Sequence, residues 1–317
     1  MLAEKLDAPV LNTVNAKGVL PASHALAIGG SPSLATVRAA MAEADVILAV
    51  GTEFGETDYD MLFIGELALP GRLIRVDIDA QQLARNVRPE LAIAGDAALV
   101  LAALTQAVAA RQPGAGAVRV QSLREQRLGE EHYHPEFAAL FAAIQTALPG
   151  LILVGDSTLP TYYAVWQYET QQPRRYFHSA TGGGTLGYAI PAALGARLAQ
   201  PDTAVAALIG DGSAQFTLAE LAAGVEAGLP IAVMIWNNQG YREIKQGMLA
   251  ADIEATGVDI FTPDFIVVAQ GLGCKALRVR TLEQLQDALR DSQLQQCPTV
   301  IELDQSDFVS LPAGQWY

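Results

Sequence analysis

The chain has 317 residues, of which 51% are hydrophobic and 17% charged, and its formal net charge is −14. This length allows two domains with their own cores, and the acidic balance argues against nucleic acid or an anionic membrane as a partner. No apolar run reaches membrane-spanning length, no signal-peptide pattern opens the chain, and two cysteines without metal-ligand spacing suggest a reducing compartment, so we expect a cytoplasmic, soluble protein.

Residues 1–112 predict an α/β domain. Strands are expected at 10–13, 46–50 and 73–77, and helices at 34–43 and 97–111. The run Gln-Pro-Gly-Ala-Gly-Ala at 112–117 is typical of a flexible linker, and the charged stretch 125–134 is typical of a solvent-facing segment. We therefore expect a linker over residues 113–134.

Residues 135–317 predict a second α/β domain. A helix is expected at 135–147, and strands at 151–154, 204–209, 231–236, 276–279 and 299–303. Several of these strands are continuously apolar, which is typical of parallel strands covered on both faces. The predicted fold class is thus α/β, with two doubly wound parallel-sheet domains.

The second domain contains the most informative stretch. A buried strand ends at Gly210-Asp211-Gly212-Ser213, a run with helical spacing covers 216–229, and the next strand delivers Asn237-Asn238. Asp211 and Asn238 are separated by one loop–helix–strand excursion, so both are expected at the carboxyl edge of the sheet, where α/β proteins bind ligands.

The chemistry of these residues suits a diphosphate held through a hard cation. Gly212 and Ser213 can offer backbone N–H groups and a hydroxyl to an anion at a helix N-terminus. The carboxylate of Asp211 and the side-chain carbonyl of Asn238 are oxygen ligands that Mg²⁺ accepts. A lone Gly-Asp-Gly would also suit a plain turn. The Asn-Asn pair after the next strand makes the binding site the better interpretation.

This pattern resembles the thiamine-diphosphate signature of the acetolactate synthase, pyruvate oxidase and benzoylformate decarboxylase group. The resemblance implies that Asp211, Asn238 and the backbone carbonyl of Gly240 bind the metal. A second segment, GGGTLGYAIP at 182–191, is similar to another element of this family. It implies that Leu186 wedges between the two rings of the cofactor and that the carbonyl of Gly184 accepts a hydrogen bond from the aminopyrimidine. Without the resemblance, Leu186 would be read as an ordinary core leucine.

Other residues are less specific. Thr158 follows the strand LILVG and either contacts the diphosphate or caps a helix. Tyr241 either covers the phosphates or packs. His178 is a candidate catalytic histidine because histidine titrates near neutral pH. For His132 and His134, in the predicted linker, a solvated role is the stronger interpretation.

The first block resembles the central domain of the same enzymes, through ADVILAVG at 44–51, RVDID at 75–79, NVRP at 86–89 and GDA at 95–97. Some relatives hold FAD in this domain. Here no G-x-G-x-x-G opens a helix, and 24–33 departs from the flavin-contacting stretch of the synthases. FAD is therefore not expected.

The resemblance begins inside the central domain and lacks the N-terminal pyrimidine-binding domain, which supplies the glutamate that activates the cofactor. We expect the C-terminal part of a longer enzyme, or a subunit that needs a partner, and no activity from this chain alone. The activating residue is unknown here: Glu243 could reach the cleft, but an exposed helical glutamate is the simpler interpretation. The resemblance also implies a dimer or tetramer that shares its cofactor between subunits.

The segment after Asn238 bears on the reaction. The synthases have a tryptophan in the following helix and this chain has none there, which favours decarboxylation of a 2-oxo acid over acetolactate synthesis. Glu243 could pair with a guanidinium tail, as in 2-ketoarginine, unless Arg242 and Lys245 face it. Two further hypotheses stay open: a non-catalytic cofactor-binding module, and a nucleotide-binding role for the first block.

Overall fold

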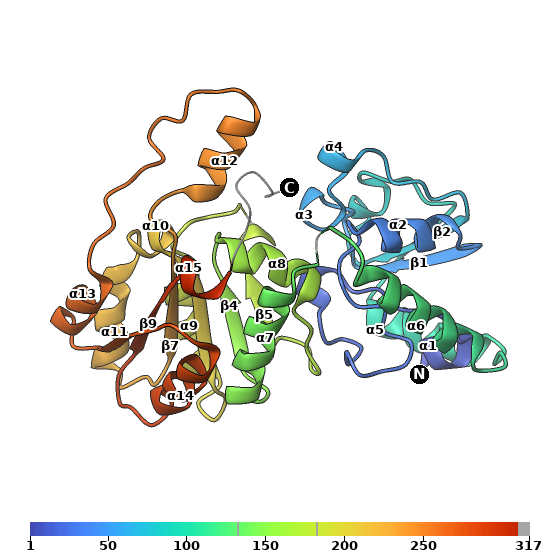
Figure 1. The fold of residues 1–317 in the computed structure, drawn as a ribbon. Helices are drawn as coiled ribbons and strands as arrows, with labels where there is room; N and C mark the ends of the chain where they lie inside the picture. Colours follow the sequence, from blue (N-terminus) through green and yellow to red (C-terminus); the bar gives the residue numbers. More distant parts are fainter. Residues whose placement is uncertain (132, 182, 310–317) are drawn as a thin grey trace. The chain divides into compact units, whose positions relative to one another are not determined.

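The computed structural model describes residues 1–131, 133–181 and 183–309. It divides into two compact units, Met1–Tyr133 and His134–Tyr317. Each unit is built around a parallel sheet with helices beside it, which confirms the predicted α/β class (Figure 1).

The first unit has a three-stranded parallel sheet in the order β1-β2-β3. Its strands are β1 (Val46–Val50), β2 (Arg72–Asp77) and β3 (Leu91–Ala94), and Val46 is in register with Arg72. Its helices are α1 (Leu2–Leu6), α2 (Ala35–Ala42), α3 (Glu56–Tyr59), α4 (Met61–Ile64), α5 (Ala97–Ala107) and α6 (Ala115–Arg127), with 3-10 turns η1 (Val14–Ala16) and η2 (Gln82–Ala84).

The strand predicted at 10–13 is wrong. Only an isolated parallel bridge joins Val10 to Ala27 there. The chain then turns into η1, where the N–H of Val14 donates to Asp58 Oδ1 at 2.7 Å instead of to a neighbouring strand. A β-ladder cannot continue where the backbone N–H groups donate to side chains instead of to a neighbouring strand.

The flexible linker predicted around 112–117 is also not what the structure contains. Residues 115–127 form helix α6, which buries Val120 and Leu123. The N–H of Gly116 donates to Asp7 Oδ2 at 2.8 Å, and the Arg124 guanidinium donates to the Ala22 and Ala27 carbonyls at 2.8 and 2.9 Å. Glycine and alanine indicated flexibility, but the apolar stripe that follows them attaches this segment to the first unit.

The second unit has a six-stranded, all-parallel sheet in the order β5-β4-β6-β7-β9-β8. The strands are β4 (Ile152–Gly155), β5 (Tyr176–His178), β6 (Val205–Gly210), β7 (Ala232–Asn237), β8 (Lys275–Val279) and β9 (Thr299–Asp304). All five strands predicted here are confirmed to within one residue at either end. The sequence reading missed β5, because three residues are too few to show a period.

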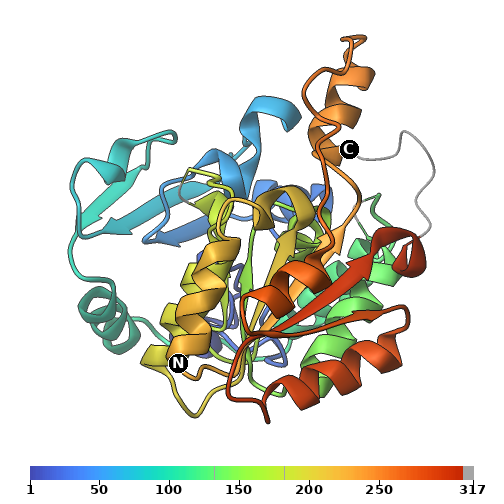
Figure 2. The same cartoon turned by 90° about the vertical axis from the view of Figure 1, so that its left-hand side faces the viewer.

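Helices cover both faces of this sheet (Figures 1 and 2). One face packs against α9 (Ala189–Ala199), α11 (Leu221–Glu226) and α13 (Phe265–Gly271). The other carries α7 (Pro135–Ala147), α8 (Leu159–Gln167) and α14 (Leu282–Ser292). The remaining elements are η3 (Ser179–Thr181), α10 (Asp211–Ala214), η4 (Leu218–Glu220), α12 (Arg242–Ala250) and α15 (Gln305–Phe308).

The single helix expected over 216–229 is instead a series of short turns. α10 begins at Asp211, and the chain breaks near Thr217 before η4 and α11. At the break the Thr217 hydroxyl donates to the Gly187 carbonyl at 2.9 Å, which ties this region to the loop before α9. This hydrogen bond matters for function because it holds two loops at the carboxyl edge of the sheet together.

Candidate functional site

Three neighbouring strands end at one pocket of the second unit. β4, β6 and β7 are adjacent in the sheet, and the direction of strand addition reverses between β4 and β6, where doubly wound sheets bind ligands. The pocket is lined by Ser157, Thr158, Leu159, Tyr162, Leu186, Gly210, Asp211, Gly212, Ser213, Asn238, Gly240, Tyr241, Arg242, Glu243 and Ile244. The structure therefore brings together all the predicted cofactor- and metal-binding residues except Gly184.

The three predicted metal ligands converge within this pocket. One terminal atom of the Asn238 amide lies 3.0 Å from the Gly240 carbonyl oxygen and 3.2 Å from Asp211 Oδ1. An octahedral Mg²⁺ with bonds of about 2.1 Å places neighbouring ligand atoms about 3.0 Å apart. The two distances from Asn238 fit such a cation.

The surroundings of Asn238 decide which atom of its amide faces the other two ligands. The opposite end of the amide lies 3.3 Å from Gln305 Oε1, which also accepts from the Trp236 indole N–H at 3.0 Å. Because indole nitrogen can only donate, the Gln305 atom between them is an oxygen, and Asn238 presents its Nδ2 to it. Its Oδ1 then faces Asp211 and Gly240. Three oxygens at this spacing repel one another, which a bound cation would reverse.

The other carboxylate oxygen of Asp211 is held by the protein. Asp211 Oδ2 accepts from the Gly240 N–H at 2.8 Å and from the Thr262 hydroxyl at 3.3 Å. Asp211 is buried, and burial raises the pKa of its carboxyl above the ordinary range. A cation beside it would favour the ionised form again.

The turn that presents Asn238 and Gly240 requires unusual backbone. Gln239 has φ 63° and Gly240 φ 141°, and a Cβ at Gly240 would lie 2.7 Å from the Val258 carbonyl oxygen. Only glycine fits there. Asn237 supports the turn, because its Oδ1 accepts from the Gln239 N–H at 3.1 Å.

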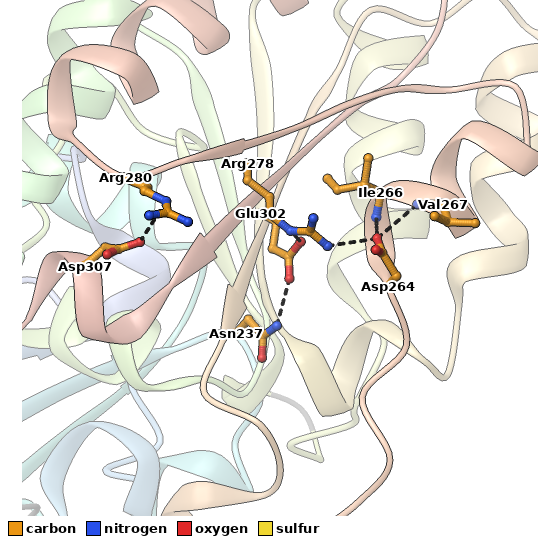
Figure 3. A network of polar contacts seen from close by, with 8 residues as sticks. All are labelled: Asn237, Asp264, Ile266, Val267, Arg278, Arg280, Glu302 and Asp307. Atoms are coloured by element: carbon orange, nitrogen blue, oxygen red, sulfur yellow. Dashed lines mark hydrogen bonds and ion pairs between the residues drawn. The ribbon is translucent and has the colours of Figure 1, made fainter.

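A chain of polar contacts, buried at Asn237 and Glu302 and exposed at Arg278, fixes Asn237 in turn (Figure 3). Asn237 Nδ2 donates to Glu302 Oε1 at 2.8 Å, and Glu302 Oε2 accepts from Arg278 Nε at 2.7 Å. The Arg278 guanidinium also pairs at 2.8 Å with Asp264, which caps α13 by accepting from the N–H groups of Ile266 and Val267. Sequence reasoning missed this chain, although a glutamate inside the apolar run TVIEL was a signal for it.

Asp156, at the end of β4, holds the second predicted cofactor segment. It is fully buried, and its carboxylate accepts from the N–H groups of Ser157, Gly187 and Ala189 at 2.8, 3.3 and 2.8 Å. This fixes the loop that carries Leu186, which is half-buried and lines the pocket. Gly184 has φ 64° and is not among the residues that line the pocket. The wedge and carbonyl roles of Leu186 and Gly184 stay predictions.

The remaining predicted contacts surround the expected diphosphate position. Thr158 caps α8, with its N–H donating to Thr161 Oγ1 at 3.3 Å, and it also lines the pocket. The Ser213 hydroxyl donates to the Ser157 carbonyl at 3.2 Å. The Tyr241 ring covers Gly212, where an added Cβ would lie 2.6 Å from a ring carbon, so glycine permits this approach.

Glu243 is not the exposed helical residue of the simpler interpretation. It lies in the first turn of α12, and both of its carboxylate oxygens are buried at the pocket without a hydrogen-bond partner among the described residues. Burial raises its pKa to about 7. Helical spacing could not show this, because the opposite residues of the pocket come from the loop after β4 and from α8.

The histidines do not converge on this pocket. His178 is buried at the end of β5, its Nδ1 accepts from the Ala180 N–H at 3.0 Å, and burial lowers its pKa to about 4. A neutral ring with that pKa is a poor general base near pH 7. His134 packs edge-on against Tyr163 at 4.9 Å, and His132 lies outside the described residues.

Two kinds of feature are absent from the described residues. There is no cluster of three or more His, Cys, Asp or Glu side chains that could bind a metal, so a metal here would depend on one carboxylate and neutral oxygens. The same residues include no helix that is both long enough and apolar enough to span a membrane.

Two family models match the chain, and together they cover more than half of it. The model described as "Thiamine pyrophosphate enzyme, C-terminal TPP binding domain" matches residues 155–303. The model described as "Thiamine pyrophosphate enzyme, central domain" matches residues 1–104. The first of these contains every residue that lines the pocket.

Curated relatives agree with the models. A probable 2-ketoarginine decarboxylase of Pseudomonas aeruginosa is 37% identical over 307 residues, covering 95% of this chain and 54% of the relative. Benzoylformate decarboxylase of the same organism is 33% identical, covering 95% and 57%. An acetolactate synthase of Mycobacterium bovis is 29% identical, covering 95% and 52%. The chain thus spans about half the length of these relatives. It belongs to the thiamine pyrophosphate enzymes and carries their central domain and their C-terminal cofactor-binding domain.

Proposed function

We propose that this chain is part of a thiamine-diphosphate- and Mg²⁺-dependent decarboxylase of a 2-oxo acid with a cationic side chain, such as 2-ketoarginine. The observation that carries the proposal is the convergence of Asp211 Oδ1, Asn238 Oδ1 and the Gly240 carbonyl at the spacing of octahedral Mg²⁺ ligands. The identity to the probable 2-ketoarginine decarboxylase supports the reaction and the substrate class.

The chain's own residues would bind and orient the cofactor. Asp211, Asn238 and Gly240 would hold the cation, and Gly212, Ser213, Thr158 and Tyr241 would bind the diphosphate. Leu186 would support the conformation of the two rings. When bound, thiamine diphosphate supplies the nucleophilic carbon and the electron sink that decarboxylation of a 2-oxo acid needs.

Acetolactate synthesis is the second candidate, supported by the synthase at 29% identity. Decarboxylation is favoured because the relatives with higher identity are decarboxylases by name, and because α12 has no tryptophan. A non-catalytic cofactor-binding module is the third candidate. We propose that the activating glutamate comes from a region outside this chain, and that the active form is a cytoplasmic homo-oligomer.

The test is carbon dioxide release by the complete enzyme that carries this chain, supplied with thiamine diphosphate and Mg²⁺. We expect turnover of 2-ketoarginine above that of benzoylformate and pyruvate, and its loss after treatment with a chelator. Acetolactate formation from pyruvate as the main reaction would support the second candidate. Cofactor binding without turnover of any 2-oxo acid would support the third.

Asp211→Ala tests the metal site directly. The change removes the only charged ligand of the three, so calorimetry should show Mg²⁺-dependent cofactor binding weakened by at least about 100-fold. Asp202→Asn, which removes a charge from an exposed position, is the matched control and should bind normally. Normal binding by Asp211→Ala would overturn the assignment.

A further inference from the structure

The carboxyl group of Glu243 has no hydrogen-bond partner in the described part of the chain. Both of its carboxylate oxygens are buried at the wall of the pocket. A buried carboxylate without donors is unfavourable unless something with donors or positive charge comes to it. The position of Glu243 is thus better suited to a ligand than to the protein alone.

The two neighbouring cations do not neutralise this carboxylate. Lys245 Nζ lies 2.6 and 2.8 Å from the two carboxylate oxygens of Asp259, so its charge is already paired. Arg242 is exposed, and no hydrogen bond joins it to Glu243. The charge of Arg242 lowers the pKa of the Glu243 carboxyl, but burial raises that pKa by more. Neither cation therefore supplies the hydrogen bonds that Glu243 lacks.

The carboxylate is also held in a defined place. Glu243 follows Gly240 by three residues, so the strained turn that presents the metal ligands also sets the start of α12. Across the pocket lies Tyr162, whose pKa is raised by burial and also by the nearby charge of Glu243. Apart from the exposed Arg242, the pocket lining contains no cationic side chain.

The charges of the expected ligands favour a cationic group beside Glu243. A 2-oxo acid brings a carboxylate and the cofactor brings a diphosphate, so an additional protein carboxylate in the pocket would repel both. A substrate with a cationic end can compensate it. A guanidinium group can also donate two parallel hydrogen bonds to one carboxylate, which satisfies both oxygens of Glu243 at once.

We infer that Glu243 is the specificity residue of this site and that it binds the guanidinium end of the substrate. The inference rests on the proposed decarboxylase function and adds the residue that selects the substrate. A neutral substrate of the same shape would leave the carboxylate without a partner, and the enzyme should discriminate against it.

The experiment compares two substrates that differ in one group. 2-Ketoarginine carries a guanidinium, and 5-ureido-2-oxopentanoate is its neutral isostere with an oxygen in place of one nitrogen. For the wild-type complete enzyme we expect kcat/KM to favour the guanidinium compound by about 10- to 100-fold, the range of a charged hydrogen-bonded pair. In Glu243→Gln this preference should fall below about threefold, through loss on the guanidinium substrate alone.

Two further variants control for charge and folding. Glu254→Gln removes one negative charge from an exposed position in the segment after α12 and should keep the wild-type preference. Glu243→Asp keeps the charge on a shorter side chain, and the variant should keep part of the preference for the guanidinium substrate. Circular dichroism melting of each variant shows whether it is folded.

The outcomes separate this inference from the proposed function. If Glu243→Gln slows both substrates equally, Glu243 acts on the reaction itself and the inference is wrong. An unchanged preference in Glu243→Gln would also overturn it. If the wild type decarboxylates only neutral 2-oxo acids, the decarboxylase reaction stands, but the cationic substrate class and the inference about Glu243 are both wrong. If it decarboxylates no 2-oxo acid, the proposed function fails, and equal calorimetric binding of 2-ketoarginine by wild type and Glu243→Gln would remove the inference as well.

Discussion

Leu186 and Leu221 show how two leucines of one domain differ in role. Leu221 is fully buried in the core between the sheet and its helices, whereas Leu186 is half-buried at the pocket. The loop of Leu186 is fixed by hydrogen bonds to Asp156 rather than by the leucine side chain itself. Because the loop does not depend on the Leu186 side chain, that side chain is available to contact a ligand.

We therefore expect Leu186→Ala to affect the cofactor more than the fold. The change should lower the free energy of unfolding by less than about 1 kcal/mol, while Leu221→Ala should cost about 2–5 kcal/mol as a buried core truncation. In the complete enzyme, Leu186→Ala should exchange the thiazolium C–H proton more slowly and retain the cofactor less well. A large melting shift with normal proton exchange would mean that Leu186 is merely a packing residue.

Glu243 also predicts how stability depends on pH. Its pKa is about 7 in the folded protein against an ordinary value of 4.5, because burial disfavours the charged form. Between these values the folded state binds more protons than the unfolded state. The free energy of unfolding should consequently fall as the pH rises from about 4.5 to about 7. Burial raises the pKa of Asp156 and Asp211 in the same direction.

Glu243→Gln isolates this contribution. The amide cannot ionise, so the variant should match the wild type near pH 4.5 and be more stable by on the order of 1 kcal/mol at pH 8, after allowance for partial exposure. Urea unfolding followed by tryptophan fluorescence reports this directly, because Trp166 and Trp236 lie in the second unit. A wild-type pH dependence in the variant, as expected for the Glu254→Gln control, would contradict the assignment.

At the scale of elements, the turn proposed to bind the metal depends on strands that do not contain the proposed ligands. β9 supplies Glu302 and β8 supplies Arg278, and together they hold Asn237 at the end of β7 (Figure 3). A metal ligand is useful only when its orientation is fixed, and such supporting contacts commonly matter about 10-fold or more in metal affinity. The sheet thus orients the site from two strands away.

Glu302→Gln should weaken Mg²⁺-dependent cofactor binding by about tenfold, because the amide loses the charge that holds Arg278 and one acceptor oxygen. Arg280→Ala is the matched control. Arg280 lies in the same region, and its pair with Asp307 is long, at 3.9 Å, and partly exposed. Calorimetry measures Mg²⁺-dependent cofactor binding by both variants. If the two variants bind the cofactor with equal affinity, the Asn237–Glu302–Arg278 chain serves stability alone.

At the scale of the whole molecule, the second unit exposes large apolar side chains near the carboxyl edge of its sheet. They are Phe216, Ile244, Leu249, Ile253 and Phe261. Phe261 is 83% exposed, which is unusual for phenylalanine on a surface in contact with water alone. Such a surface suits another chain, and the family resemblance implies a cofactor shared between subunits.

We therefore expect the complete enzyme to be at least a dimer, with two equivalent sites related by a closed two-fold arrangement. Light scattering at the concentrations used for activity measurements checks this, and a fully active monomer would contradict it. Phe261→Ser should shift the equilibrium towards monomers, while Leu294→Ser, at another exposed apolar position, should leave it unchanged.

The sequence by itself determined the local features of this protein. Strands at 46–50, 204–209 and 231–236 were predictable because continuous apolar runs between glycine, proline and polar residues are local signals, and the match of the GDGS and Asn-Asn segments identified the cofactor. Only the tertiary structure decided which way these residues face. The Asn238 amide is oriented by Trp236 and Gln305, and Glu243 is buried in a pocket lined by the loop after β4 and by α8. Helix α6 is held by contacts with residues about 100 positions earlier. Such outcomes depend on packing between segments distant in the chain, and no periodicity or composition of a single segment contains that information.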